Sequence, residues 1–124
     1  MQLSDFELAT VLAMPGPERY EYFVKQVAGG GKVWGLYRDG WALAGAGQQQ
    51  VLPLWPNEQF AEMCAAGPWE GHLPASFSVQ ELLDVVLPKL AESALVPGIF
   101  YTPTDQGVIA APADLAAAVK AAAA

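Results

Sequence analysis

The chain has 124 residues, which is enough for one domain with a single buried core and too few for two ordinary domains. Apolar residues make up 53% of the sequence and charged residues 15%, a composition that indicates a compact fold rather than intrinsic disorder. The formal net charge of -7 argues against binding of nucleic acid through its phosphates.

No apolar run approaches the ~18 residues that a membrane-spanning helix needs. The first residues, Met1 to Glu7, have no basic head before an apolar stretch, so we expect a cytoplasmic protein without a secretory signal. Cys64 is the single cysteine, which excludes an internal disulfide and a multi-cysteine zinc site. We therefore expect no membrane association and no cofactor.

Two capping boxes predict where helices begin. Ser4 is followed by Glu7, and Ser78 is followed by Glu81, so that each serine can cap a helix whose third residue is a glutamate. The first helix should extend to the Pro-Gly-Pro turn after Met14, and the second should be kinked or shortened at Pro88.

Apolar spacing, with proline or glycine at the ends, predicts three further helices. They span residues 17–28, residues 57–66 and a carboxy-terminal segment from Pro112, whose last residues, 121–124, we expect to fray. The triple glycine at 29–31 follows a helix and precedes a strand, which is the reverse of the order in a phosphate-binding loop. It is therefore interpreted as a helix end and a turn.

The clearest strand signal is a hairpin over residues 32–44, with Asp39-Gly40 as a two-residue turn. This turn would place Arg38 opposite Trp41. One side of the ribbon would then be bulky and packed on helices, and the other side would be open and small. The bulky side carries Trp34, Leu36, Arg38, Trp41 and Leu43, and the small side carries Val33, Gly35, Tyr37, Ala42 and Ala44.

Three more strands are predicted at 51–55, 94–102 and 108–110. Pro53 should lie at an edge or a bulge, and Pro97-Gly98 should form a bulge. Residues 68–77 are expected to be a loop. The elements together predict a single α+β domain over residues 1–124, with an antiparallel sheet of about five strands packed with about five helices.

The sequence resembles the bacterial family called domain of unknown function 2750, over roughly Tyr20 to Leu115. The motifs that carry the resemblance are Tyr20-Glu21-Tyr22-Phe23, Val33-Trp34-Gly35-Leu36-Tyr37, Asp39-Gly40-Trp41-Ala42-Leu43 and Leu52-Pro53-Leu54-Trp55-Pro56. The resemblance implies an architecture and a bacterial cytosolic origin. It implies no activity and no catalytic residues.

The sequence offers little for catalysis. His72 is the only histidine, and no Gly-X-Ser-X-Gly elbow is present to supply a serine nucleophile. Cys64 lies on an apolar helix stripe without a neighbouring cation, as expected of a buried structural thiol. One histidine and one cysteine do not build a usual zinc site. We therefore expect no enzyme and no metal.

Four tryptophans are many for 124 residues. They can form the core between sheet and helices, or Tyr37, Trp55 and Trp69, with His72 nearby, can rim a binding groove. The second interpretation favours a non-enzymatic protein-binding or adaptor module, immunity-like or regulatory, whose partner is another protein or a second copy. The alternative is a small-molecule-binding protein or minor enzyme, with a pocket over the small side of the 32–44 hairpin.

Overall fold

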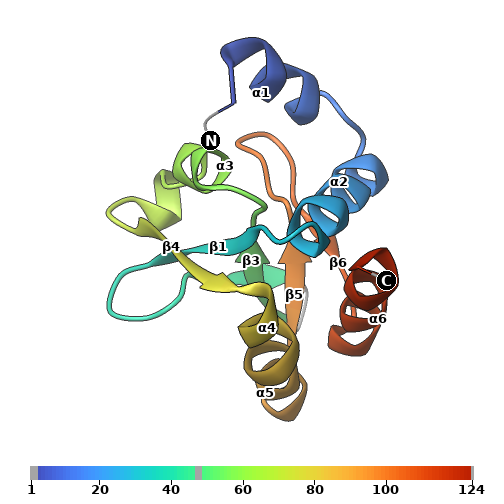
Figure 1. The fold of residues 1–124 in the computed structure, drawn as a ribbon. Helices are drawn as coiled ribbons and strands as arrows, with labels where there is room; N and C mark the ends of the chain where they lie inside the picture. Colours follow the sequence, from blue (N-terminus) through green and yellow to red (C-terminus); the bar gives the residue numbers. More distant parts are fainter. Residues whose placement is uncertain (1–2, 47–48, 124) are drawn as a thin grey trace.

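Helices surround two small sheets in the part of the chain that the computed structural model describes, residues 3–46 and 49–123 (Figure 1). The strands are β1 (Lys32–Tyr37), β2 (Ala44–Ala46), β3 (Gln49–Leu54), β4 (Leu73–Ser78), β5 (Leu95–Ile99) and β6 (Val108–Ile109). The helices are α1 (Asp5–Leu12), α2 (Gly16–Ala28), α3 (Glu58–Met63), α4 (Val79–Glu81), α5 (Leu87–Glu92) and α6 (Pro112–Ala123). The predicted α+β class is confirmed.

The prediction of one antiparallel sheet is wrong, because the strands form two separate sheets. One sheet has the order β2-β3-β5-β6, and its central strands β3 and β5 are parallel. The other sheet is a ribbon of β1 and β4. The ribbon is tied to the end of β3 because the backbones of Trp34 and Trp55 exchange two hydrogen bonds of 2.9 and 2.8 Å.

The predicted 32–44 hairpin is wrong in its register and in its main partner. Asp39 does adopt a positive φ of 58°, but the loop holds three residues, and Tyr37 rather than Arg38 lies opposite Trp41. A shift of one residue moves a side chain to the other face of a ribbon. Trp41 therefore lies on the same face of the ribbon as Gly35, and 39% of its surface is exposed. The long antiparallel partner of β1 is β4 rather than residues 41–44.

Strand β4 occupies residues that were predicted to be a loop. Before it, Gly67–Trp69 forms a short 3-10 turn. The segment 73–78 has weak apolar alternation and contains Pro74, so its own sequence gives a poor strand signal. Pairing with all of β1, from Lys32 opposite Ser78 onward, provides the hydrogen bonds that the local sequence does not predict.

Both predicted capping boxes start helices. The Ser4 hydroxyl accepts a hydrogen bond from the Glu7 amide at 3.1 Å, and the Ser78 hydroxyl accepts one from the Glu81 amide at 3.1 Å. The predicted disturbance at Pro88 takes the form of a π turn over Leu82–Val86, between α4 and α5. Helix α6 runs to Ala123, so residues 121–123 are helical, and residue 124 lies outside the described residues.

The sequence predicted an edge or a bulge at Pro53 and a bulge at Pro97-Gly98, and the bulge at Pro97-Gly98 is not formed. Strand β3 is central in its sheet, but β2 pairs only with residues 49–51, so Pro53 lies beyond the end of β2. The register of β3 and β5 continues without a bulge through Gly98. A Cβ at Gly98 would meet Val51 and come within 2.7 Å of the Tyr101 ring, so glycine here allows close packing.

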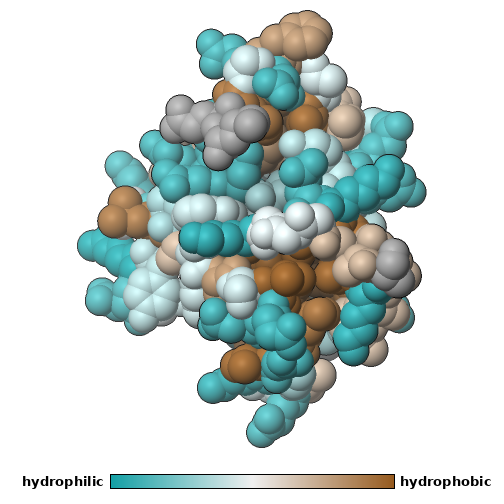
Figure 2. Space-filling model, in the orientation of Figure 1, coloured by the Kyte–Doolittle hydropathy of each residue, from teal (hydrophilic) through white to brown (hydrophobic). Residues whose placement is uncertain are grey.

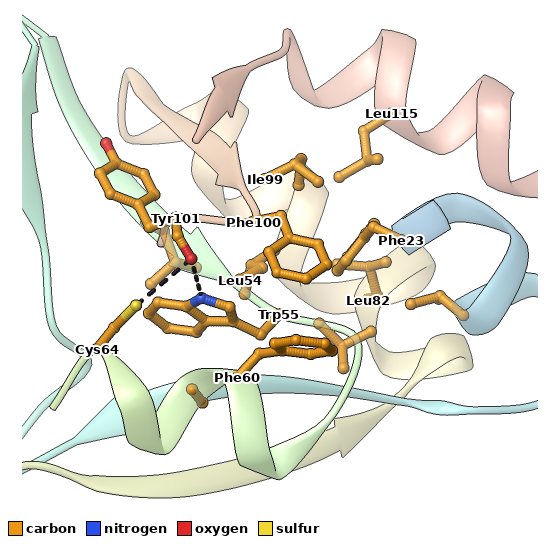
Figure 3. Packing of buried hydrophobic residues seen from close by; sticks show 14 of the residues in the cluster. Phe23, Leu54, Trp55, Phe60, Cys64, Leu82, Ile99, Phe100, Tyr101 and Leu115 are labelled. Carbon is orange, nitrogen blue, oxygen red and sulfur yellow. Dashed lines mark hydrogen bonds between the residues drawn. The ribbon is translucent and has the colours of Figure 1, made fainter. Parts of the chain in front are cut away.

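The core lies between the four-stranded sheet and the helices (Figure 3). Trp55, Phe60 and Phe100 are among its largest fully buried side chains, and the rings of Phe60 and Phe100 lie 4.7 Å apart. The indole N–H of Trp55 donates to the carbonyl of Tyr101 at 2.8 Å. This bond satisfies the one polar atom of the indole inside the core.

Arg19 is buried, with only 3% of its surface exposed. Its guanidinium donates to the carbonyls of Met14 at 2.6 Å, Phe100 at 3.4 Å and Gln106 at 3.5 Å. Asp105 is an exposed counter-ion 4.0 Å away. The side chain therefore joins the start of α2 to the loop after β5 mainly through backbone carbonyls.

Candidate functional site

An apolar groove opens between β4, with the neighbouring segment 41–43, and the helical run formed by the π turn 82–86 and α5. It has a volume of about 380 Å³ and is lined mainly by apolar side chains, with Lys89 and Ser93 as polar members. The lining residues are Trp41, Leu43, Leu52, Phe77, Val85, Val86, Lys89, Leu90, Ser93 and Leu95. Figure 2 shows apolar side chains gathered in the lower half of the view, over the region of α4 and α5.

An aromatic stack forms one wall of this groove. The ring of Trp41 packs edge-on against Tyr37, with centroids 5.2 Å apart, and against Phe77, with centroids 5.7 Å apart. Gly35 makes this packing possible, since a Cβ there would lie 2.9 Å from the Trp41 ring. Tyr37 and Trp41 both remain partly exposed, so the stack presents apolar surface to solvent.

The opposite wall comes from the π turn and α5. Val85 is 56% exposed although it is large and apolar, and Leu90 is buried beside the core. Lys89 is the ionisable residue of the lining, so its ammonium supplies the positive charge at the groove. The site offers a hydrophobic surface with one cationic point of contact.

Of the four predicted site residues, the structure brings Trp55, Trp69 and His72 together and places Tyr37 in the aromatic stack with Trp41. Tyr37 is exposed in the aromatic stack. Trp55 is completely buried, so its predicted place on a groove rim is wrong. Trp69 is half-buried and packs edge-on against Trp55 with centroids 6.1 Å apart, and His72 Nδ1 lies 3.1 Å from the Trp69 carbonyl.

Cys64 is a buried thiol at the end of α3. Its Sγ donates to the carbonyl of Tyr101 at 3.4 Å, the same carbonyl that accepts from Trp55 (Figure 3). Burial raises the pKa of the Cys64 thiol from its usual 9.0 to about 11, and the Trp55 side chain has a smaller, lowering effect on this pKa. The thiol is therefore protonated at neutral pH and is a poor nucleophile.

We expect Cys64 to make stability depend on pH in the alkaline range. Because its folded pKa lies above the unfolded one, its contribution is full below pH 9.0 and is lost as the pH rises toward 11. Urea titrations between these pH values should show a smaller decline for Cys64→Ala than for the parent. Burial also raises the pKa values of Tyr20, Tyr22 and Tyr101, but both proteins contain these groups. Parallel declines in the two proteins would contradict the assignment.

Comparison with protein families tests the family resemblance that the sequence motifs indicated. Residues 20–119 match the family model described as protein of unknown function (DUF2750). The chain belongs to the DUF2750 family. The match runs from Tyr20 within α2 to residue 119 within α6, and it leaves out α1 and the start of α2. No curated protein matches this DUF2750 chain.

Two kinds of feature are absent from the described residues of this DUF2750 protein. Within residues 3–46 and 49–123, no three histidine, cysteine, aspartate or glutamate side chains gather in a way that could hold a metal ion. Among the helices of the same residues, none combines the length and the apolar character needed to cross a membrane.

Sequence reasoning missed most of the groove in this DUF2750 protein. Phe77 lies on β4, which was predicted to be a loop, and Val85 belongs to a helix that was predicted without a π turn. Val85 was the signal in the sequence that could have indicated the groove. It is an apolar residue between Asp84 and the core-facing Val86, so it falls outside the apolar stripe that a helix buries. Trp41 was predicted on the wrong face.

Proposed function

We propose that this DUF2750 protein is a non-enzymatic binding module whose groove receives an apolar segment of a partner protein. The observation that carries this proposal is the exposure of large apolar side chains, among them Trp41, Leu43 and Val85, around a hollow of about 380 Å³. Exposed apolar surface around a concavity is typical of interaction sites. A regulatory or immunity-like adaptor fits this arrangement.

The charges favour a partner of defined character. The net charge of -7 speeds encounter with a basic protein. At the groove itself, Lys89 offers a contact for a carboxylate at the end of the apolar segment. The family resemblance and the single buried thiol favour a bacterial cytoplasmic setting.

The lining also favours binding over catalysis. Its polar side chains are Lys89 and Ser93, and no histidine or carboxylate belongs to the lining to act as a base. The Cys64 thiol lies outside the lining and is kept protonated by the burial that raises its pKa. We therefore propose that the protein is not an enzyme.

The decisive variant is Val85→Asp, which places a charge on the apolar wall. Its binding to a partner should weaken by at least about tenfold, because the carboxylate must lose water when the groove is filled. The tagged full chain is incubated with extract of its native source, and retained proteins are identified and then measured by titration calorimetry. Val85 is exposed in the free protein, so the melting temperature should change little.

Phe6→Asp is the matched control, since Phe6 is an 80% exposed apolar residue on α1. It should retain the same partner with unchanged affinity. Equal binding by Val85→Asp and the parent, or no retained protein at any salt concentration, would contradict the proposal.

A small apolar ligand is the second candidate for the same groove. Its volume of about 380 Å³ lies in the range of small-molecule pockets. The sequence predicted this pocket over the small side of the hairpin, and on that side the Trp41 ring, which lines the groove, lies against Gly35. Thermal shifts against an apolar metabolite panel distinguish the two functions: a shift lost in Val85→Asp supports the ligand, and no shift supports the protein partner.

A further inference from the structure

Among the residues that the structure describes, β4 pairs with β1, and its other backbone edge faces away from that partner. Trp34 directs both its N–H and its carbonyl to Trp55, at 2.9 and 2.8 Å, and the Leu36 carbonyl accepts from Ala42 at 2.8 Å. These groups therefore point away from β4. Because the direction alternates along a strand, Val33, Gly35 and Tyr37 direct their backbone groups toward β4.

The register of β1 and β4 then shows which backbone groups of β4 do not bond to β1. Phe77, Ala75 and Leu73 lie opposite the three inward-facing residues of β1. The N–H and carbonyl of Ser76, the carbonyl of Pro74 and the N–H of Ser78 therefore point outward. Within the described residues, Ser76 has no backbone hydrogen bond outside the sheet, and Ser76 and Ser78 are both exposed.

We propose that two copies of the chain associate through this edge, with β4 pairing antiparallel to β4 of the second copy about a two-fold axis at Ser76. The two Ser76 residues would exchange two hydrogen bonds. The N–H of each Ser78 would donate to the Pro74 carbonyl of the other copy. The two ribbons would then form one continuous sheet with the order β1-β4-β4-β1.

Pro74 selects this register among the symmetric ones. It lacks an N–H, so a pairing centred on Pro74 would place two residues without donors opposite each other. A pairing centred on Phe77 would shorten the overlap of the two strands to three residues. One centred on Ala75 would place Pro74 opposite Ser76, and Pro74 has no N–H to donate in that pair. Only the pairing centred on Ser76 keeps residues 74–78 of both strands in the sheet.

The side chains are compatible with a second copy. Leu73 is 71% exposed in the single chain, and this register places it opposite Val79 of the other copy. Ala75 would lie opposite Phe77. No residue of 73–78 carries a charge, although the chain as a whole has a net charge of -7. Charged side chains commonly protect strand edges from pairing, and this edge has none.

Sedimentation equilibrium of the full chain tests the proposal. The parent should form a dimer of twice 13.1 kDa as the concentration is raised. Ser76→Pro removes two of the intermolecular donors while leaving the bonds to β1, so the dimer should weaken by about 30-fold, equivalent to about 2 kcal/mol at 1.4 kcal/mol per tenfold. Ser76→Ala, which changes only the side chain, should dimerise as the parent does.

A measurement on the unmutated protein guards against misfolding of Ser76→Pro. In a dimer of labelled and unlabelled chains, a filtered nuclear Overhauser experiment should show the Hα of Ala75 close to the Hα of Phe77 of the other copy. A parent that stays monomeric at all concentrations, or a dimer without this contact, would overturn the proposal. Val85→Asp should leave the dimer intact, which separates this surface from the groove.

Discussion

Replacing Trp55 with alanine should lower the free energy of unfolding by about 3–5 kcal/mol, the largest loss that we expect from one side chain of this protein. The indole is completely buried beside Phe60 and Cys64, so its removal leaves a cavity in the core. It also takes away the donor of the 2.8 Å bond to Tyr101. Urea unfolding followed by circular dichroism measures the loss.

Trp41→Ala is the matched control, because it removes the same side chain from a position that is 39% exposed. We expect it to cost about 1–2 kcal/mol, from partial burial and two edge-on ring contacts. Equal losses in the two variants would mean that Trp55 is not the centre of the core. Trp55→Phe should fall between the two, since it keeps an aromatic ring and loses the N–H donor.

Replacing Arg19 with methionine should lower the free energy of unfolding by about 3 kcal/mol. Methionine fills much of the space but offers no donor to the carbonyls of Met14, Phe100 and Gln106. These carbonyls lie around a side chain that is almost entirely buried, so water replaces the lost donors poorly. Thermal and urea unfolding should both report the change.

Asp105→Asn separates the carbonyl contacts from the ion pair. Asp105 is exposed and lies 4.0 Å from the guanidinium, so its neutralisation should cost less than about 1 kcal/mol. A loss as large as that of Arg19→Met would show that the ion pair, rather than the carbonyl contacts, carries the stability. Arg19→Lys should recover part of the loss because it keeps one donor group.

Local signals in the sequence predicted the helices well. Ser4 and Ser78 cap helices through atoms three residues away, so the information lies within one turn. Strand β4 could not be predicted in the same way, because its hydrogen bonds come from β1, about forty residues earlier. The parallel pairing of β3 with β5 has the same origin, since no local motif specifies it.

The candidate site was harder to predict than the fold. The aromatic residues were correctly singled out, but their exposure depends on one residue of register at the Asp39 turn. With Tyr37 opposite Trp41, the Trp41 ring covers Gly35 from outside. Trp55 instead follows a central strand into the core. The burial of Arg19 could not be predicted from the pattern of apolar residues. Its guanidinium is stabilised by backbone carbonyls that come together only in the folded chain.

The Tyr101 carbonyl also bears on how the protein is made. Trp55 and Cys64 both donate to this one oxygen, which lies 46 and 37 residues later in the chain. Contacts over such separations are slow to form, and a growing polypeptide cannot make these two before Tyr101 has been synthesised. A ribosome-bound chain that has passed Trp55 therefore carries an uncovered indole until Tyr101 emerges, and during that interval chaperones have a reason to bind it.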